Sequence, residues 1–210
     1  MMVFAGFGAA IGCWAGAIPQ VIAAAGINSL DLGIGLTLNS LAGVTAISLG
    51  GMIGRRFSNR SVMLGALPLL ALILILLLVA TSFWLFFASL IAFGALLGFL
   101  DMAMNAEASA IEHDLRRPIF TTFHGSVSIA IAFFAIVSSF LSAIAGTFAT
   151  SMLGVAVLGL AWLMVYRSVP ARPVTAGRAG GLSHLPSRLP LIIIGMAVGL
   201  SIAAETSTLF

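Results

Sequence analysis

Residues 64–80 read LGALPLLALILILLLVA and contain no charged side chain. A run like this is most of one membrane-spanning helix, which needs about 20 apolar residues. The rest of the chain agrees, because 61% of its 210 residues are hydrophobic and 7% are charged, whereas a soluble domain carries about 25% charged residues. A membrane barrel would show segments of about ten residues that alternate in polarity. Because lipid forces the backbone to satisfy its own hydrogen bonds, these long runs predict an all-α integral membrane protein.

Seven stretches are apolar and long enough to span a bilayer. They are residues 3–25, 32–54, 61–80, 83–104, 119–145, 148–166 and 189–210. The connections between them are short, apart from one rich in Pro, Gly and Arg at 167–188. We therefore predict a six-helix transmembrane bundle at 1–166, a cytoplasmic linker at 167–188 and a further transmembrane helix at 189–210.

Arginine follows every second predicted span. Arg55, Arg56 and Arg60 follow the second span, Arg116 and Arg117 follow the fourth, and four more follow the sixth. The alternate connections carry neither arginine nor lysine. Short arginine-rich connections stay in the cytoplasm, so we predict a multi-pass membrane protein with a cytoplasmic N-terminus. These small patches are topology signals and do not indicate a nucleic-acid partner.

Few residues suggest a metal site or an enzyme. Cys13 is the single cysteine, which excludes an intrachain disulfide or a cysteine zinc cluster. Glu112, His113 and Asp114 come at the end of the fourth helix beside two arginines, where solvated ion pairs are expected. No nucleophile with a recognisable activating partner and no glycine-rich nucleotide motif stands out. We therefore expect no cofactor, no metal and no enzymatic activity.

Pairs of glycines four residues apart recur in every third span. They are Gly8 and Gly12, Gly94 and Gly98, and Gly195 and Gly199. Each pair alone indicates close helix packing. Their recurrence, with the fourth span inverted relative to the first, favours a three-plus-three inverted repeat followed by the first helix of another repeat, as in transporters.

The connection after the second span reads GMIGRRFSNR, from Gly51 to Arg60. It resembles the signature loop of the major facilitator superfamily, which reads Gly, three variable residues, Asp-Arg, a variable residue, Gly and then basic residues. Gly51, Arg56 and Arg60 match this pattern. Arg55 occupies the acidic position and Ser58 the second glycine position. The resemblance implies a gating loop that lacks the contact usually made by the acidic residue.

The fourth and fifth spans refine the resemblance. Residues 98–106 read GFLDMAMNA, and residues 123–125 read FHG after Glu112 and Pro118. With GCWA at 12–15, they are similar to the bacterial fucose-permease-like branch. The resemblance implies a bacterial inner-membrane carrier with two six-helix halves, alternating access, a small polar solute such as a sugar, and proton coupling. This chain would then be the N-terminal half plus helix 7, and its C-terminal half would be a missing partner.

Asp101 is the first candidate for the substrate and proton pathway. The fourth helix is expected to continue to Leu115, which places Asp101 about 20 Å from that end at 1.5 Å per residue. An acid at this depth is costly and usually faces a cavity or a partner. Asp101, Asn105, Ser109 and Glu112 share one helix face, which indicates either a pathway lining or a packing stripe of hydrogen bonds.

The other pathway candidates are polar or aromatic residues in apolar spans. His124 can exchange protons near neutrality or pack through a hydrogen bond. Trp14 can stack on a sugar ring or pack in the core. Gln20, Asn39 and Glu205 complete the set.

Two other functions are compatible with the sequence. The chain could be a truncated, non-transporting fragment or a half-unit that needs a partner. A membrane-embedded enzyme or a signalling protein is a more remote alternative.

Overall fold

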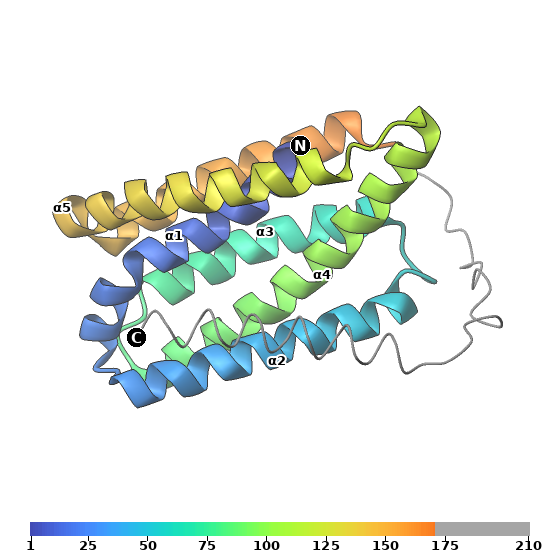
Figure 1. Cartoon of the computed structure of the whole chain (residues 1–210). Coiled ribbons are helices and arrows are strands. Elements are labelled where there is room, and N and C mark those ends of the chain that lie inside the picture. The colour runs from blue at the N-terminus through green and yellow to red at the C-terminus, as the bar shows by residue number, and fades with distance from the viewer. Residues whose placement is uncertain (171–210) are drawn as a thin grey trace. The chain divides into compact units, whose positions relative to one another are not determined.

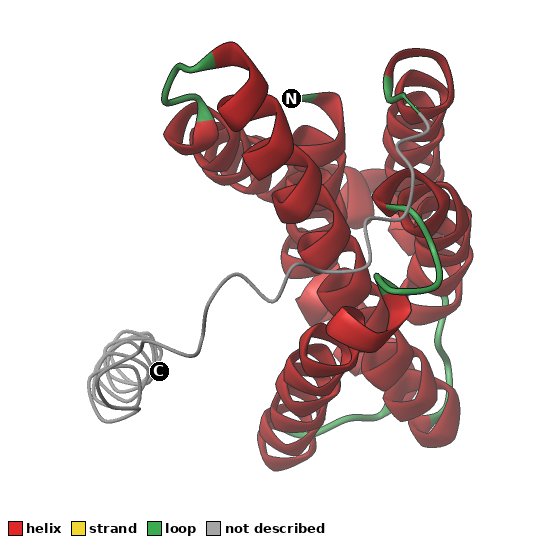
Figure 2. Cartoon of the chain, turned by 90° about the vertical axis from the view of Figure 1, so that its right-hand side faces the viewer, coloured by secondary structure: helices red, strands yellow, loops and turns green. Residues whose placement is uncertain are grey.

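The structure is a computed structural model that describes residues 1–170. The described residues form five helices, labelled in Figure 1. These are α1 (Met2–Ala25), α2 (Ser29–Ile53), α3 (Asn59–Leu78), α4 (Phe83–Leu115) and α5 (Phe120–Ser168). Residues 1–170 contain no strand (Figure 2), and each of the five helices is long and apolar enough to cross a membrane. The predicted all-α membrane fold is confirmed, and the predicted span at 189–210 lies outside the described residues.

Short polar side chains cap the starts of α2 and α4. Asn28 accepts the backbone amide of Asp31 at 2.9 Å, and the Asp31 carboxylate accepts the Asn28 amide at 3.4 Å. Ser82 accepts the Leu85 amide at 3.4 Å at the start of α4. These bonds satisfy amides that the first helical turn leaves without a partner. They allow connections of only a few residues between consecutive spans.

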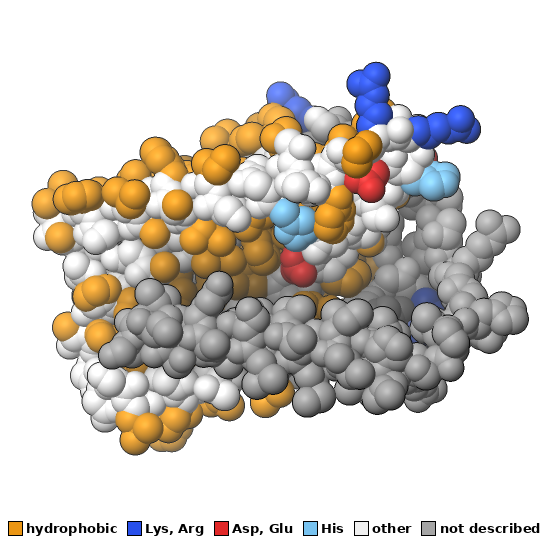
Figure 3. Space-filling view, in the orientation of Figure 1, with side chains coloured by type: hydrophobic (Ala, Val, Ile, Leu, Met, Phe, Trp, Pro, Cys, Tyr) orange, Lys and Arg blue, Asp and Glu red, His pale blue; other side chains and the backbone are white. Residues whose placement is uncertain are grey.

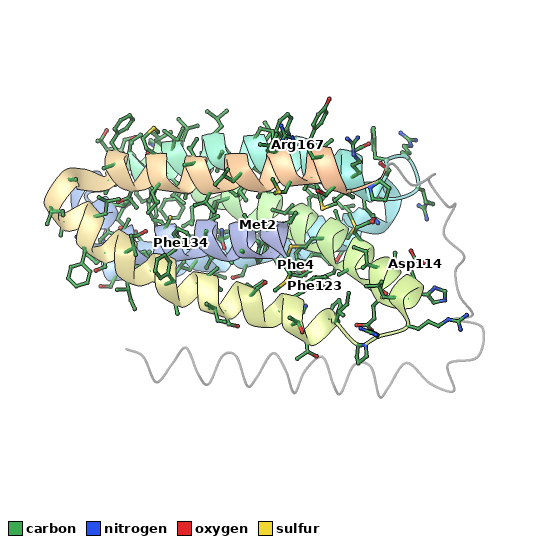
Figure 4. All side chains as sticks on the ribbon, turned by 90° about the horizontal axis from the view of Figure 1, so that it is seen from above. Met2, Phe4, Asp114, Phe123, Phe134 and Arg167 are labelled. Atoms are coloured by element: carbon green, nitrogen blue, oxygen red, sulfur yellow. The ribbon has the colours of Figure 1, made fainter. Side chains whose placement is uncertain are left out.

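Gly146 divides α5 into two arms. A straight 49-residue helix would be about 74 Å long, more than twice the hydrocarbon thickness of about 30 Å. Gly146 has φ 83° and ψ 167°, a conformation that is essentially restricted to glycine, and the chain doubles back there (Figures 1 and 4). We call residues 120–145 the first arm and residues 147–168 the second arm. They correspond to the predicted fifth and sixth spans.

The connections fall into two groups at opposite ends of the described helices (Figure 1). The α1–α2 and α3–α4 connections and Gly146 lie at one end. The α2–α3 and α4–α5 connections and the end of α5 lie at the other. All described arginines belong to the second group. This separation is what the alternating arginine pattern requires, while the orientation in the membrane stays a prediction.

Glycines on α1 bring it against the first arm of α5. A Cβ atom at Gly8 would lie 2.5 Å from the carbonyl oxygen of Val127, and one at Gly12 would lie 2.6 Å from that of Ile131. These distances leave no space for a side chain. The pairs recur four residues apart on both helices, as expected for two helices packed along glycine faces.

Glycines on α4 do the same against α2. A Cβ atom at Gly94 would collide with the carbonyl oxygen of Asn39, and one at Gly98 with that of Gly43. The predicted repeat consists of spans one to three and spans four to six. The first helix of each set, α1 or α4, therefore uses its own glycines to pack against the second helix of the other set. The inverted repeat itself stays a prediction.

Helix α3 supplies much of the apolar core. Leu67, Leu70, Leu74 and Leu77 are fully buried, and α3 packs against both α4 and α5. Most of α2 and of the first arm of α5 stays exposed in residues 1–170. Of the described pathway candidates, Asn39 and His124 lie on these less covered helices, and Asp101, Asn105 and Ser109 lie on α4. Trp14 and Gln20 lie on α1.

Candidate functional site

Asp101 is a half-buried acid in the apolar helix α4. Its Oδ1 accepts a hydrogen bond from Nδ2 of Asn105, one turn further along, at 2.9 Å. An acid near the centre of a spanning helix costs about 2.5–3.5 kcal/mol on insertion scales. One hydrogen bond from a neutral amide offsets only part of such a cost. Asp101 is therefore a polar group with capacity for a further partner.

Asp101 lies at a groove between α2 and α4. The groove has a volume of about 330 Å³, and Phe7 of α1 contributes to its wall. It brings Asp101 together with two polar residues of α2, the predicted candidate Asn39 and its neighbour Ser40. The remaining lining residues are small or apolar: Gly43, Val44, Ile47, Gly94, Leu97 and Gly98. A mostly apolar groove with a few converging polar groups is the usual form of a small-molecule site.

Asn39 holds the two walls of this groove together. Its Nδ2 donates a 2.8 Å hydrogen bond to the carbonyl oxygen of Leu90 on α4. The bond is possible because Gly94, one turn further along, lets the two backbones approach closely. The sequence indicated Asn39 as a polar candidate, and the structure shows that its amide also has a packing role.

His124 lies on the first arm of α5 and is exposed. Its ring contacts Phe120, at a centroid distance of 4.7 Å, and Phe4 of α1, at 5.8 Å. It is also close enough to Asp101 for a charge interaction. Phe4 in turn stacks on Phe123 at a centroid distance of 5.1 Å. Both residues are labelled in Figure 4. These aromatic contacts hold the imidazole on the side of the bundle that carries Asp101.

The predicted polar face of α4 is divided between two environments. Asp101 lines the α2–α4 groove, whereas Ser109 and Glu112 line a second groove at the α4–α5 turn. Glu112 Oε2 accepts the backbone amides of Ile119 and Phe120, each at 2.8 Å. Glu112 thus caps the start of α5. Helix spacing alone placed Glu112 on the same face as Asp101. It did not indicate that Glu112 caps α5.

Trp14 and Gln20 do not join the Asp101 groove. Trp14 is 6% exposed and packs against Phe86 at a centroid distance of 6.0 Å. Gln20 is half-buried, and its Oε1 has no hydrogen-bond partner among residues 1–170. Their roles in a pathway stay predictions. Glu205 lies outside the described residues.

The predicted gating loop, residues 51–60, includes the end of α2, the α2–α3 connection and the start of α3. Gly51 belongs to α2, and Arg55 and Arg56 are exposed. Arg60 donates from Nη2 to the carbonyl oxygen of Tyr166 at 2.9 Å, and its guanidinium lies 5.6 Å from the Tyr166 ring centroid. The loop is therefore fastened to the second arm of α5. Sequence analysis missed this contact, although an aromatic residue at the end of an arginine-flanked span was a possible signal.

A second contact missed from the sequence joins α3 to α4. Glu107 is only 4% exposed, and its Oε2 accepts a 3.4 Å hydrogen bond from Nδ2 of Asn59. Asn59 directly precedes Arg60, so α3 begins with two polar contacts to two different helices. No spacing rule along one helix indicates such a pair.

Two curated proteins are similar to part of the chain. An uncharacterised MFS-type (major facilitator superfamily) transporter of Yersinia pestis is 31% identical over 122 residues, which are 58% of this chain and 32% of the relative. The membrane protein MosC of Rhizobium meliloti is 30% identical over 124 residues, which are 59% of this chain and 30% of the relative. The match thus spans about a third of the length of each relative. No family model and no solved structure matches the sequence.

The name of the Yersinia pestis relative suggests membrane transport as the general class of function. It agrees with the multi-pass helical fold, which makes this chain an all-α membrane protein. It names neither a solute nor a coupling ion.

Proposed function

We propose that this chain is the front part of a secondary transporter of the major facilitator type. It moves a small polar solute across the bacterial inner membrane by alternating access and is a carrier, not an enzyme. Asp101 contributes to the proton pathway. The N-terminus faces the cytoplasm.

The placement of Asp101 carries this proposal. The residue lies in an apolar helix and at a groove that also contains Asn39. Among residues 1–170 its carboxylate accepts one hydrogen bond, from Asn105. Ionisable residues in spanning helices commonly mark solute or proton routes. A purely structural acid would be expected to have its hydrogen-bonding capacity filled by neighbouring helices.

The proximity of His124 to Asp101 supports proton coupling in particular. An acid and a histidine on two different helices respond to relative helix movement, because their separation changes with it. Such a pair biases one conformation of a two-state carrier over another.

The groove favours a small polar solute over a large apolar one. Its volume of about 330 Å³ is at the lower end of small-molecule sites. The amide of Asn39, the hydroxyl of Ser40 and the carboxylate of Asp101 can hydrogen-bond to solute hydroxyl groups. The resemblance to fucose permeases makes sugars the first class to test.

Transport assays with the protein expressed from its complete gene test the proposal. Uptake of a panel of radiolabelled sugars is measured in bacteria that lack their own carriers, with and without a protonophore. Accumulation that the protonophore abolishes is expected for at least one solute. If the protein reaches the membrane and no solute in a wide panel moves, the non-transporting alternative replaces the proposal.

A further inference from the structure

A polar groove lies at the turn between α4 and α5, apart from the Asp101 groove. Its volume is about 530 Å³. Its lining residues are Ser109, Glu112, His113, Arg116, Arg117 and Pro118. Basic side chains project at this end of the molecule, beyond the apolar body of the helices (Figure 3).

Positive charge dominates this groove. Arg116 and Arg117 are exposed, and neither forms an ion pair with any of residues 1–170. The acid in the lining, Glu112, directs Oε2 at two backbone amides of α5 and is thereby engaged by the helix terminus. His113 lies 3.9 Å from Asp114, which extends outward at this turn (Figure 4). Two exposed guanidinium groups therefore line the groove.

The backbone holds both arginines in a defined turn. Arg116 ends α4 with φ 50° and ψ 37°, and it is the one residue other than glycine with a positive φ in the described chain. Pro118 has a restricted φ and directly precedes the Glu112-capped start of α5. A preformed arrangement of donors loses less conformational freedom when it binds a ligand.

The surroundings of the groove are those of a membrane boundary. Leu115, next to Arg116, is 56% exposed, and Ile119 and Phe120 at the start of α5 are partly exposed. Both flanking helices are apolar and long enough to cross a bilayer. An anion bound here would therefore have acyl chains or apolar helix surface beside it.

We propose that the α4–α5 groove binds the phosphate of an anionic phospholipid through Arg116 and Arg117. Guanidinium groups bind phosphate oxygens in a bidentate manner. Basic pockets between spanning helices on the cytoplasmic side suit anionic headgroups. Ser109 supplies a hydroxyl donor, and the apolar residues at the turn contact the acyl chains. The site does not depend on which solute the protein carries.

Lipid binding by the purified whole protein tests this site. The protein in detergent is titrated with phosphatidylglycerol, and retained lipid is counted by native mass spectrometry. Replacing both arginines, R116Q with R117Q, should weaken the first bound lipid about tenfold, because charge-assisted hydrogen bonds to phosphate are lost. The matched control, R55Q with R56Q, removes the same charge from two exposed arginines of the α2–α3 connection and should leave the first lipid bound.

Four results would overturn the proposal. Equal losses in both double variants would show that net charge attracts the lipid without a specific groove. Equal retention of phosphatidylcholine would remove the preference for an anionic lipid. Displacement of the lipid by millimolar inorganic phosphate would identify a soluble anion as the ligand. If the R116Q and R117Q protein does not fold, R117Q alone should still weaken binding measurably, and unchanged binding would reject the site.

Discussion

Glu112 in the last turn of α4 accepts the backbone amide of Phe120, the first residue of α5, at 2.8 Å. The same oxygen accepts the amide of Ile119, whose own side chain offers no cap. A side chain of one helix thus performs the capping of the next. The connection between the two spans is fixed by this carboxylate.

Loss of this cap should destabilise the protein. Glu112→Ala is expected to lower the free energy of unfolding by about 1–2 kcal/mol, the cost of losing a helix cap. Glu112→Gln should cost less, because an acceptor oxygen remains while the charge near the helix terminus is lost. The measurement is unfolding in mixed detergent, monitored by circular dichroism.

Asp114→Ala is the matched control for the cap. Asp114 is two residues away and exposed, and its separation from His113 is 3.9 Å. Exposed pairs contribute about 0–1 kcal/mol. Equal destabilisation by Glu112→Ala and Asp114→Ala would contradict the capping role.

Asp101→Asn should separate proton coupling from solute movement. The amide keeps the size and hydrogen-bonding capacity of the side chain but cannot titrate. We expect proton-driven accumulation to fall to background, while counterflow of solute without a gradient continues at a comparable rate. Both are measured in the same vesicles, at matched levels of protein in the membrane.

A packing role for Asp101 gives a different pattern. Asn would then preserve both activities, and Asp101→Leu would lower the amount of folded protein. Accumulation by the Asn variant at the unmodified rate would rule out a proton-carrying Asp101. Asn105→Ala, which removes the hydrogen bond to Asp101, provides a second variant for this comparison.

Gly12→Ala should disrupt the contact between α1 and the first arm of α5. The new methyl group would lie 2.6 Å from the Ile131 carbonyl oxygen, so the helices must separate. Overpacking of this kind costs about 1–3 kcal/mol. Thermal stability in detergent measures the effect.

Gly65→Ala is the control for this substitution. Gly65 also lies in a spanning helix, α3, but a Cβ atom there meets nothing within 4 Å. Alanine should be neutral or slightly stabilising at Gly65, because it favours a helix. The packing argument fails if both variants melt at the same temperature.

Reporter fusions test the proposed orientation. Fusions after Arg60 and Arg117 should report the cytoplasm, and fusions after Asn28 and Ser82 should report the opposite side. The two groups of sites lie at opposite ends of the helices in Figure 1. A cytoplasmic signal from the Ser82 fusion would contradict the orientation.

The spans were predictable because their lengths are imposed by the bilayer. The predicted stretch 61–80 nearly coincides with α3 (Asn59–Leu78), and the expected extension of α4 to Leu115 is confirmed. The glycine pairs of α1 and α4 were also recognisable, since close packing requires small residues at a fixed spacing. Both signals are local in the sequence.

The partners of the polar residues were not predictable in the same way. Helix spacing placed Glu112 on the face of Asp101, but a cap depends on where the chain re-enters α5. The meeting of Asn39 with Asp101 in one groove depends on how α2 and α4 cross. Burial of Trp14 depends on the rotation of α1 about its axis. Hydrophobicity along one helix constrains none of these relationships.

The turn at Gly146 has a consequence for biogenesis. One residue separates the two arms of α5, so no hydrophilic segment is available there for export across the bilayer. The arms must enter the membrane together as a helical hairpin, and the orientation of the first dictates that of the second. Arg167, which follows the second arm, then reinforces an orientation already established earlier in synthesis. Epitopes or protease sites placed at this turn should therefore interrupt insertion itself.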